Sequence, residues 1–191
     1  TSTSARALMI LGGSVTISDA VFEGLPGGAI EVSGGDVFVH TTSFKENQAE
    51  RGGALLVTGG ELRVHNSTFT EDEAEEGGAL FIKSGKARVS NSTFTDNKVN
   101  AGGVEGDAIR IIGPNVTLEL STTIVKSNFR ASQGTALRVI GGDVVLRDET
   151  ELLVGNSQLA LNISDGARVT YELPAPLGRY LSGVFLCKTV K

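Results

Sequence analysis

The chain has 191 residues, a formal net charge of −5, 25 glycines, eight Phe, two Tyr and no Trp. This length is enough for one domain with a sizeable core. The negative charge argues against nucleic acid or an anionic membrane surface as a partner. A membrane-spanning segment needs about 18 consecutive apolar residues, and no apolar run in the sequence is that long. Abundant glycine and small polar residues favour many tight turns over one large globular core.

A motif of two glycines, an alanine and an aliphatic residue recurs along the chain. It begins at Gly27, Gly52 and Gly77, 25 residues apart, and weaker copies begin at Gly106 and Gly134. A glycine turn follows each copy, and an aromatic or aliphatic residue follows that turn by ten or eleven positions. Internal periods of about 20–50 residues are typical of solenoids and propellers, and about 25 is too short for a propeller blade.

Apolar residues alternate with polar ones on both sides of each glycine turn, which predicts short strands with one buried face. The first predicted column contains Ile30/Val32, Leu55/Val57, Leu80/Ile82, Ile109/Ile111 and Leu137/Val139. The second contains Val15/Ile17, Val37/Val39, Leu62/Val64, Ala87/Val89, Val116/Leu118 and Val144/Leu146. Three short strands per coil predict an all-β, single-stranded parallel β-helix of about seven coils over residues 1–172, roughly 30–35 Å long. Residues 173–191 are predicted to be a C-terminal cap or an exit segment toward a missing downstream module.

Two further columns follow from the same spacing. The predicted core ladder consists of Phe22, Phe44, Phe69, Phe94 and Ile124. Three positions after the phenylalanines come Asn47, Asp72 and Asn97, which we expect to turn inward as a polar ladder that satisfies backbone groups. By strand parity, Phe38 and Phe81 are predicted to face outward.

The glycine motif, together with a Phe followed three residues later by Asn, resembles the repeats of the chlamydial polymorphic outer membrane proteins. It is also similar to β-helix domains of large surface proteins of algae and other protists. Gly27–Ile30, Gly52–Leu55 and Gly77–Leu80 carry the first motif; Phe44–Asn47 and Phe94–Asn97 carry the second. The resemblance implies a right-handed parallel β-helix with a role in adhesion or surface structure, and a cysteine-rich module after the segment Tyr171–Leu181.

Many β-helices act on polysaccharides, so an active site has to be considered. Glycoside hydrolysis needs a close pair of carboxylates, and the sequence shows no motif that predicts one. His40 and His65 are 25 residues apart and should lie one above the other, but the third position of their column is Ser90, which leaves a metal site incomplete. The acidic run Glu71–Glu76 is interpreted as a solvated loop, with weak calcium binding as the alternative. We therefore expect no catalytic residues, no metal and no cofactor.

Four N-x-Ser/Thr sequons, at Asn66, Asn91, Asn115 and Asn162, are candidates for N-glycosylation. The alternative for Asn66 and Asn91 is an internal asparagine ladder at a corner, with hydrogen bonds from coil to coil. The single cysteine, Cys187, is either a free thiol or the half of a disulfide with another module. The two outward threonines that flank Phe69 and Phe94 could form an ice-binding face, but that array ends after two coils.

The sequence thus predicts a non-enzymatic, secreted structural or adhesive module of a larger cell-surface or filament protein. Its expected partners are other modules or subunits of a surface assembly and N-linked glycans, with no nucleic acid and no membrane span. Because no capping helix precedes the first coil, we expect a neighbouring segment or another subunit to cover it. The alternative is a carbohydrate-binding or carbohydrate-active β-helix similar to pectate lyases.

Overall fold

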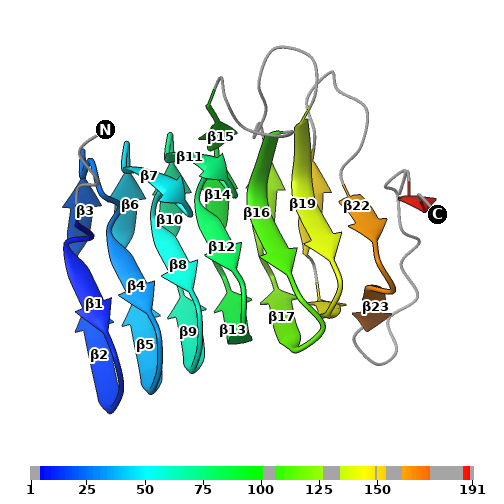
Figure 1. Cartoon of the computed structure of the whole chain (residues 1–191). Coiled ribbons are helices and arrows are strands. Elements are labelled where there is room, and N and C mark those ends of the chain that lie inside the picture. Colours follow the sequence, from blue (N-terminus) through cyan, green and yellow to red (C-terminus); the bar gives the residue numbers. More distant parts are fainter. Residues whose placement is uncertain are drawn as a thin grey trace.

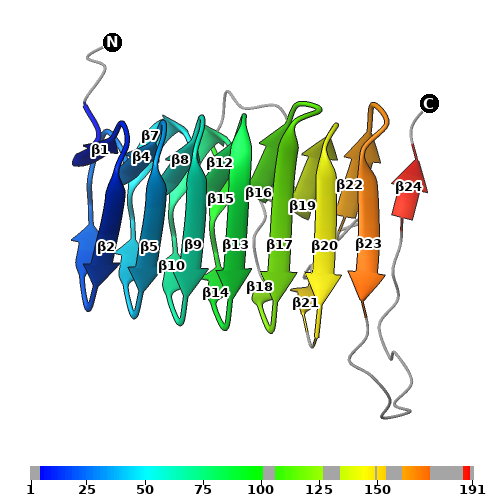
Figure 2. The same ribbon diagram turned by 90° about the horizontal axis from the view of Figure 1, so that it is seen from below.

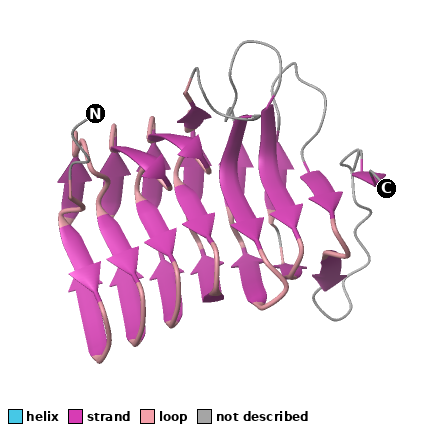
Figure 3. Ribbon diagram, in the orientation of Figure 1, coloured by secondary structure: helices cyan, strands magenta, loops and turns pink. Residues whose placement is uncertain are grey.

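The computed structural model describes residues 5–100, 106–126, 134–148, 150–153, 161–172 and 187–189. These residues form strands and turns that wind into a parallel β-solenoid of about six turns, close to the seven predicted (Figures 1 and 3). The first and last coils lie at opposite ends of the stack (Figure 1). No helix that could cross a membrane occurs among the described residues. The all-β solenoid prediction is confirmed.

Four parallel sheets run along the stack, and each strand pairs with its equivalent one coil away. The eight-stranded sheet contains β1 (Leu8–Ile10), β4 (Ile30–Val32), β8 (Leu55–Val57), β12 (Leu80–Ile82), β16 (Gly106–Ile112), β19 (Gly134–Ile140), β22 (Leu161–Ser164) and β24 (Cys187–Thr189). The seven-stranded sheet, which faces the viewer in Figure 2, contains β2 (Ser14–Ser18), β5 (Asp36–His40), β9 (Glu61–His65), β13 (Gly85–Ser90), β17 (Val116–Ser121), β20 (Asp143–Arg147) and β23 (Arg168–Glu172). The six-stranded sheet contains β3 (Val21–Glu23), β6 (Ser43–Lys45), β10 (Thr68–Thr70), β14 (Thr93–Thr95), β18 (Ile124–Lys126) and β21 (Glu151–Leu153).

A fourth, three-stranded sheet corrects the expectation of three strands per coil. It consists of β7 (Gln48–Arg51), β11 (Glu73–Glu76) and β15 (Lys98–Val99). The acidic run that was interpreted as a loop is therefore largely strand. Ala74 is the reason, because its buried side chain lies in register with Ala49 and Val99 and gives β11 an inward face.

The first apolar column is in the predicted register, with Ile30 beside Leu55, Leu55 beside Leu80, and Leu80 beside Ile109. The second column needs one correction. Ala87 lies beside Leu118 rather than Val116, so Leu118 and Leu120 are the residues of β17 in register with Ala87 and Val89, while Val116, also buried, lies beside Gly85. Pro114 and Asn115 lengthen the preceding turn, and this extension shifts the equivalent positions along the chain.

A stack of phenylalanine rings runs through the core. The ring centroids of Phe22 and Phe44 are 5.2 Å apart, those of Phe44 and Phe69 4.8 Å, and those of Phe69 and Phe94 4.3 Å, with the rings within 7° of parallel. Ile124 does not continue this ladder, which is a correction to the prediction: it lies beside Thr93, and Val125 lies beside Phe94.

The position of Thr123 explains why the Phe column passes to Val125. The Thr123 side chain is buried, as is Ser92 in the coil before, and the next inward position along a strand is two residues later. That position is Phe94 in one coil and Val125 in the next. Leu152 then lies beside Val125 and packs against the same core.

The glycine turns are required by the close approach of successive coils. Gly35 has φ of 80°, and a Cβ there would lie 2.3 Å from the carbonyl oxygen of Gly13. Gly60 has φ of 75°, and a Cβ there would lie 2.5 Å from the carbonyl oxygen of Gly35. Only glycine fits both the backbone conformation and the space, and this explains why the turn recurs in the sequence.

Candidate functional site

A shallow groove of about 520 Å³ follows one corner of the solenoid, between the six-stranded and three-stranded sheets. Glu46, Glu71 and Asp96 line one side of it, and each has a left-handed backbone with φ between 54° and 57°. They occupy equivalent positions on successive coils, because each lies at the bend between two strands. Three carboxylates therefore stand in a row along the axis, one rung apart.

Two lysines at this corner form ion pairs with Glu46 and with two other carboxylates nearby. Lys45 Nζ lies 2.9 Å from a Glu46 carboxylate oxygen and 3.2 Å from one of Glu23. Lys45 lowers the pKa of Glu46 through this hydrogen bond and by its charge. On the other side of the groove, Lys98 Nζ lies 3.2 Å from Glu73. The groove is thus a row of partly neutralised charges, with a shape and chemistry suited to a polar ligand rather than an apolar one.

The predicted polar ladder lies on the inner side of this corner, and Asn47, Asp72 and Asn97 are all fully buried. The backbone N–H of Asn47 donates to Asp72 Oδ1 at 3.0 Å, and the N–H of Asp72 donates to Asn97 Oδ1 at 3.0 Å. The side-chain amides of Asn47 and Asn97 donate to the main-chain carbonyls of Phe22 and Phe69, each at 3.0 Å. Each rung therefore satisfies main-chain groups of its neighbours, as the sequence predicted.

A second inward ladder, made of hydroxyl groups, was missed by the sequence reasoning. Its members lie at another corner and are all buried, and the first four directly follow a residue with a left-handed backbone: Thr42, Ser67, Ser92, Thr123 and Thr150. The backbone N–H of Thr42 donates to Ser67 Oγ at 3.2 Å, and the N–H of Ser67 donates to Ser92 Oγ at 3.1 Å. A Ser or Thr two residues before each of Phe44, Phe69, Phe94, Val125 and Leu152 is the sequence signal that would have revealed it.

This hydroxyl ladder gives the repeated Asn-Ser-Thr segments a structural role. Asn66 and Asn91 are exposed and have φ of 50° and 48°, a left-handed conformation that asparagine tolerates. The side-chain amide of Asn91 donates to Asn66 Oδ1 at 3.2 Å, so the predicted ladder bond exists, but it lies on the surface rather than inside the solenoid. In these two sequons the asparagine forms the bend, the serine is buried, and the threonine flanks the Phe. Both asparagines still present their side chains to solvent.

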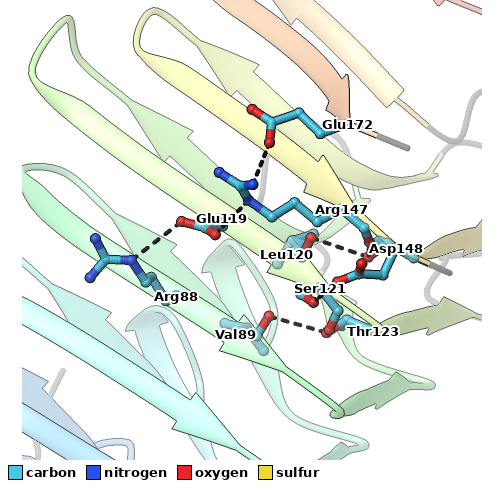
Figure 4. Close-up of polar contacts among 10 residues, drawn as sticks. Arg88, Val89, Glu119, Leu120, Ser121, Thr123, Arg147, Asp148 and Glu172 are labelled. Carbon is cyan, nitrogen blue, oxygen red and sulfur yellow. Dashed lines mark hydrogen bonds and ion pairs between the residues drawn. The ribbon is translucent and has the colours of Figure 1, made fainter. Parts of the chain in front are cut away.

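The outer face of the seven-stranded sheet carries a ladder of ion pairs, which the sequence reasoning also missed (Figure 4). Arg88 pairs with Glu61 on one side and with Glu119 on the other, where its Nε lies 3.3 Å from the carboxylate. Arg147 Nε lies 2.6 Å from Glu119, and its guanidinium also pairs with Glu172. Charges of opposite sign thus alternate from coil to coil, and each bond joins two neighbouring coils.

Phe81 lies on the outer face of its strand, as strand parity predicts, but it is not exposed there. Its side chain is only 2% exposed. The Arg51 guanidinium lies over the ring, 5.8 Å from its centroid, and is held by Glu76 at 2.8 Å. Glu76 also lies 3.5 Å from Arg110. These contacts fold the fourth sheet over the ring. Phe38 is 38% exposed, as expected.

The two histidines lie side by side on the seven-stranded sheet, as predicted. His65 Nδ1 is 3.0 Å from Ser90 Oγ, and the His40 ring packs 5.2 Å from Phe38. Within the described residues, no group of three or more His, Cys, Asp or Glu side chains is arranged to hold a metal ion.

The remaining predicted residues lie in the second half of the chain. Asn115 is exposed in the turn before β17, and Asn162 is half-buried in β22, where its backbone pairs with that of Arg138. The backbone of Cys187 belongs to β24 and pairs with that of Leu161. Its thiol and the segment 173–186 lie outside the described residues.

Comparisons of the chain with protein-family models, with curated proteins and with solved structures gave no match.

Proposed function

We propose that this chain is a non-enzymatic, extracellular β-helix module that serves as a structural or adhesive segment of a larger surface or filament protein. The observation that carries the proposal is that the polar side chains of this chain mainly connect one coil to the next. Hydroxyl, amide and ion-pair ladders each join one coil to the next along the same axis. An array of this kind resists bending and extension of the stack, because every coil is tied to its neighbours in several places.

The first coil supports a role within a larger assembly. Its strands are the outer edges of three sheets, and Met9, Leu11 and Val21 are 54%, 74% and 69% exposed. Natural proteins usually protect such edges with proline, bulges or inward charges, none of which occurs in β1, β2 or β3. We propose that another protein segment covers this end.

Localisation tests the proposal directly. Antibodies raised against the folded chain should label intact, unpermeabilised cells of the source organism or their secreted material. Labelling that appears only after permeabilisation would contradict a surface role. Intact-mass measurement of the native protein, before and after glycosidase treatment, provides a second test, because N-glycans are added only along the secretory route.

The groove at Glu46, Glu71 and Asp96 favours a second candidate function, carbohydrate binding or cleavage. Carboxylates in a polar groove can accept hydrogen bonds from sugar hydroxyls, and the groove runs along the axis as an extended polysaccharide would. A panel of soluble polysaccharides distinguishes the two functions. Release of new reducing ends, or binding that Glu71→Gln abolishes, would favour this candidate over a purely structural module.

A further inference from the structure

The ladder behind the groove contains one member of different chemistry. Asn47 and Asn97 each carry an amide that both accepts and donates, whereas Asp72 carries a carboxyl group in the same position. An ionised carboxylate can only accept hydrogen bonds. The ladder therefore places an acceptor-only group where its neighbouring coils use a donor.

The contacts of Asp72 show which of its oxygens is affected. Oδ1 accepts two hydrogen bonds from Asn47, from the backbone N–H at 3.0 Å and from the side-chain amide at 2.9 Å. Oδ2 is buried and has no hydrogen-bond partner. A buried polar atom without a partner costs free energy, and the cost is far greater for a charged group.

Equivalence along the ladder points to the group to which a proton on Oδ2 would be donated. The side-chain nitrogens of Asn47 and Asn97 donate to the carbonyls of Phe22 and Phe69, each in the coil before. For Asp72, the corresponding carbonyl is that of Phe44, since Phe44 lies in register with Phe22 and Phe69. Two unprotonated oxygens facing each other would repel, whereas a proton on Oδ2 would form the same bond that the amides form.

We propose that folded Asp72 is a neutral carboxylic acid whose Oδ2–H donates to the Phe44 carbonyl, and that loss of this proton weakens the corner, so that the solenoid carries a pH-sensitive switch. In acid the ladder is complete in all three coils. In alkali the middle rung holds a buried charge with one oxygen unpartnered.

The electrostatic surroundings agree with this assignment. The buried elements around Asp72 contribute the phenylalanine rings, and the charged groups of the corner lie at its surface: Lys45 and Glu46 from one coil, Glu71 and Glu73 from its own, and Asp96 and Lys98 from the next. Burial raises the pKa of Asp72 from an ordinary 3.8 to about 7, and the hydrogen bonds from Asn47 partly oppose this rise.

The sign of the effect on stability follows from these two pKa values. Below 3.8 both folded and unfolded chains hold the proton, so the full stability is present. Between 3.8 and about 7 the unfolded chain ionises while the folded chain does not, so stability falls as the pH rises. Above about 7 the contribution is lost. The separation of about three pH units corresponds to an approximately thousand-fold change in the folding equilibrium constant.

The test compares the wild-type chain with Asp72→Asn, which restores the amide of the neighbouring rungs. Asp96→Asn is the matched control, because Asp96 is an exposed carboxyl group at the same corner, one coil further along. Urea unfolding is measured at intervals from pH 4 to pH 9. Over this range the wild type and Asp96→Asn should lose stability in parallel as the pH rises, whereas Asp72→Asn should lose much less and be the most stable of the three at pH 9.

A second measurement does not depend on whether the Asp72→Asn variant folds. The carboxyl carbon of Asp72 in the folded wild type is followed by carbon-13 NMR as a function of pH. A titration midpoint near 7 supports the proposal, and a midpoint near 4 overturns it. Identical pH profiles for the wild type and Asp72→Asn would overturn it equally.

Discussion

Removing the Phe69 ring tests whether the stacked column in the core stabilises the solenoid. Phe69 is fully buried, and its ring lies between those of Phe44 and Phe94 at centroid distances of 4.8 and 4.3 Å. Truncation of a buried Phe to Ala costs about 3–5 kcal/mol, which includes the cavity left behind. The loss of two stacking contacts, each about 0.5–1.5 kcal/mol, places Phe69→Ala toward the upper part of that range.

Urea unfolding followed by circular dichroism measures this cost. With a denaturant dependence of about 3 kcal/mol per M, a loss of about 4 kcal/mol lowers the unfolding midpoint by more than about 1 M. Phe38→Ala is the matched control, because it removes the same atoms from an outward, 38% exposed ring and should cost about 1 kcal/mol or less. If Phe69→Ala were no more destabilised than Phe38→Ala, the column would not be a principal source of stability.

Three further predictions address the turns, the outer face and the sequons. Gly35→Ala combines a positive φ with a Cβ 2.3 Å from the Gly13 carbonyl oxygen, so we expect it to lower the free energy of unfolding by more than about 2 kcal/mol. Gly12→Ala is the control: there is open space around its Cβ, so it should be nearly neutral in the same unfolding assay. Glu119→Gln breaks two half-exposed ion pairs and should lower the free energy of unfolding by less than about 1 kcal/mol, a difference that disappears in 1 M salt. A larger loss that does not depend on salt would show that the ion-pair ladder is a dominant source of stability. In a eukaryotic secretory host, Asn115→Gln should remove the mass of one glycan, because this sequon lies in an exposed turn; an unchanged mass would show that the site is not occupied.

The sequence predicts the solenoid well because one interval of 25 residues places like residues above one another. Gly52 and Gly77, or Phe69 and Phe94, satisfy the same packing requirement in successive coils. The prediction fails where the interval changes. Pro114 and Asn115 extend a turn, so counting from the glycines selects Val116 and Ile124 in place of the residues that are in register.

The polar contacts were harder to predict, because they depend on the orientation of individual side chains, which the spacing of residues in the sequence does not specify. An inward position for Asp72 follows from its alignment with Asn47 and Asn97, but its unpartnered Oδ2 is visible only in the structure. The burial of Phe81 likewise depends on a side chain that crosses from another sheet. Parity along β12 places the ring outside the sheet, and only the position of Arg51 shows that it is covered.

The coil-to-coil ladders have a consequence for how such a molecule can change length over evolution. A coil bonds mainly with the coils directly before and after it, and the same column positions recur on both of its faces. Duplication of a 25-residue segment would therefore insert a rung whose side chains already match both neighbours, lengthening the shaft by about 4.8 Å. Deletion of such a segment would shorten the solenoid by the same amount, so its length can change in evolution by whole coils.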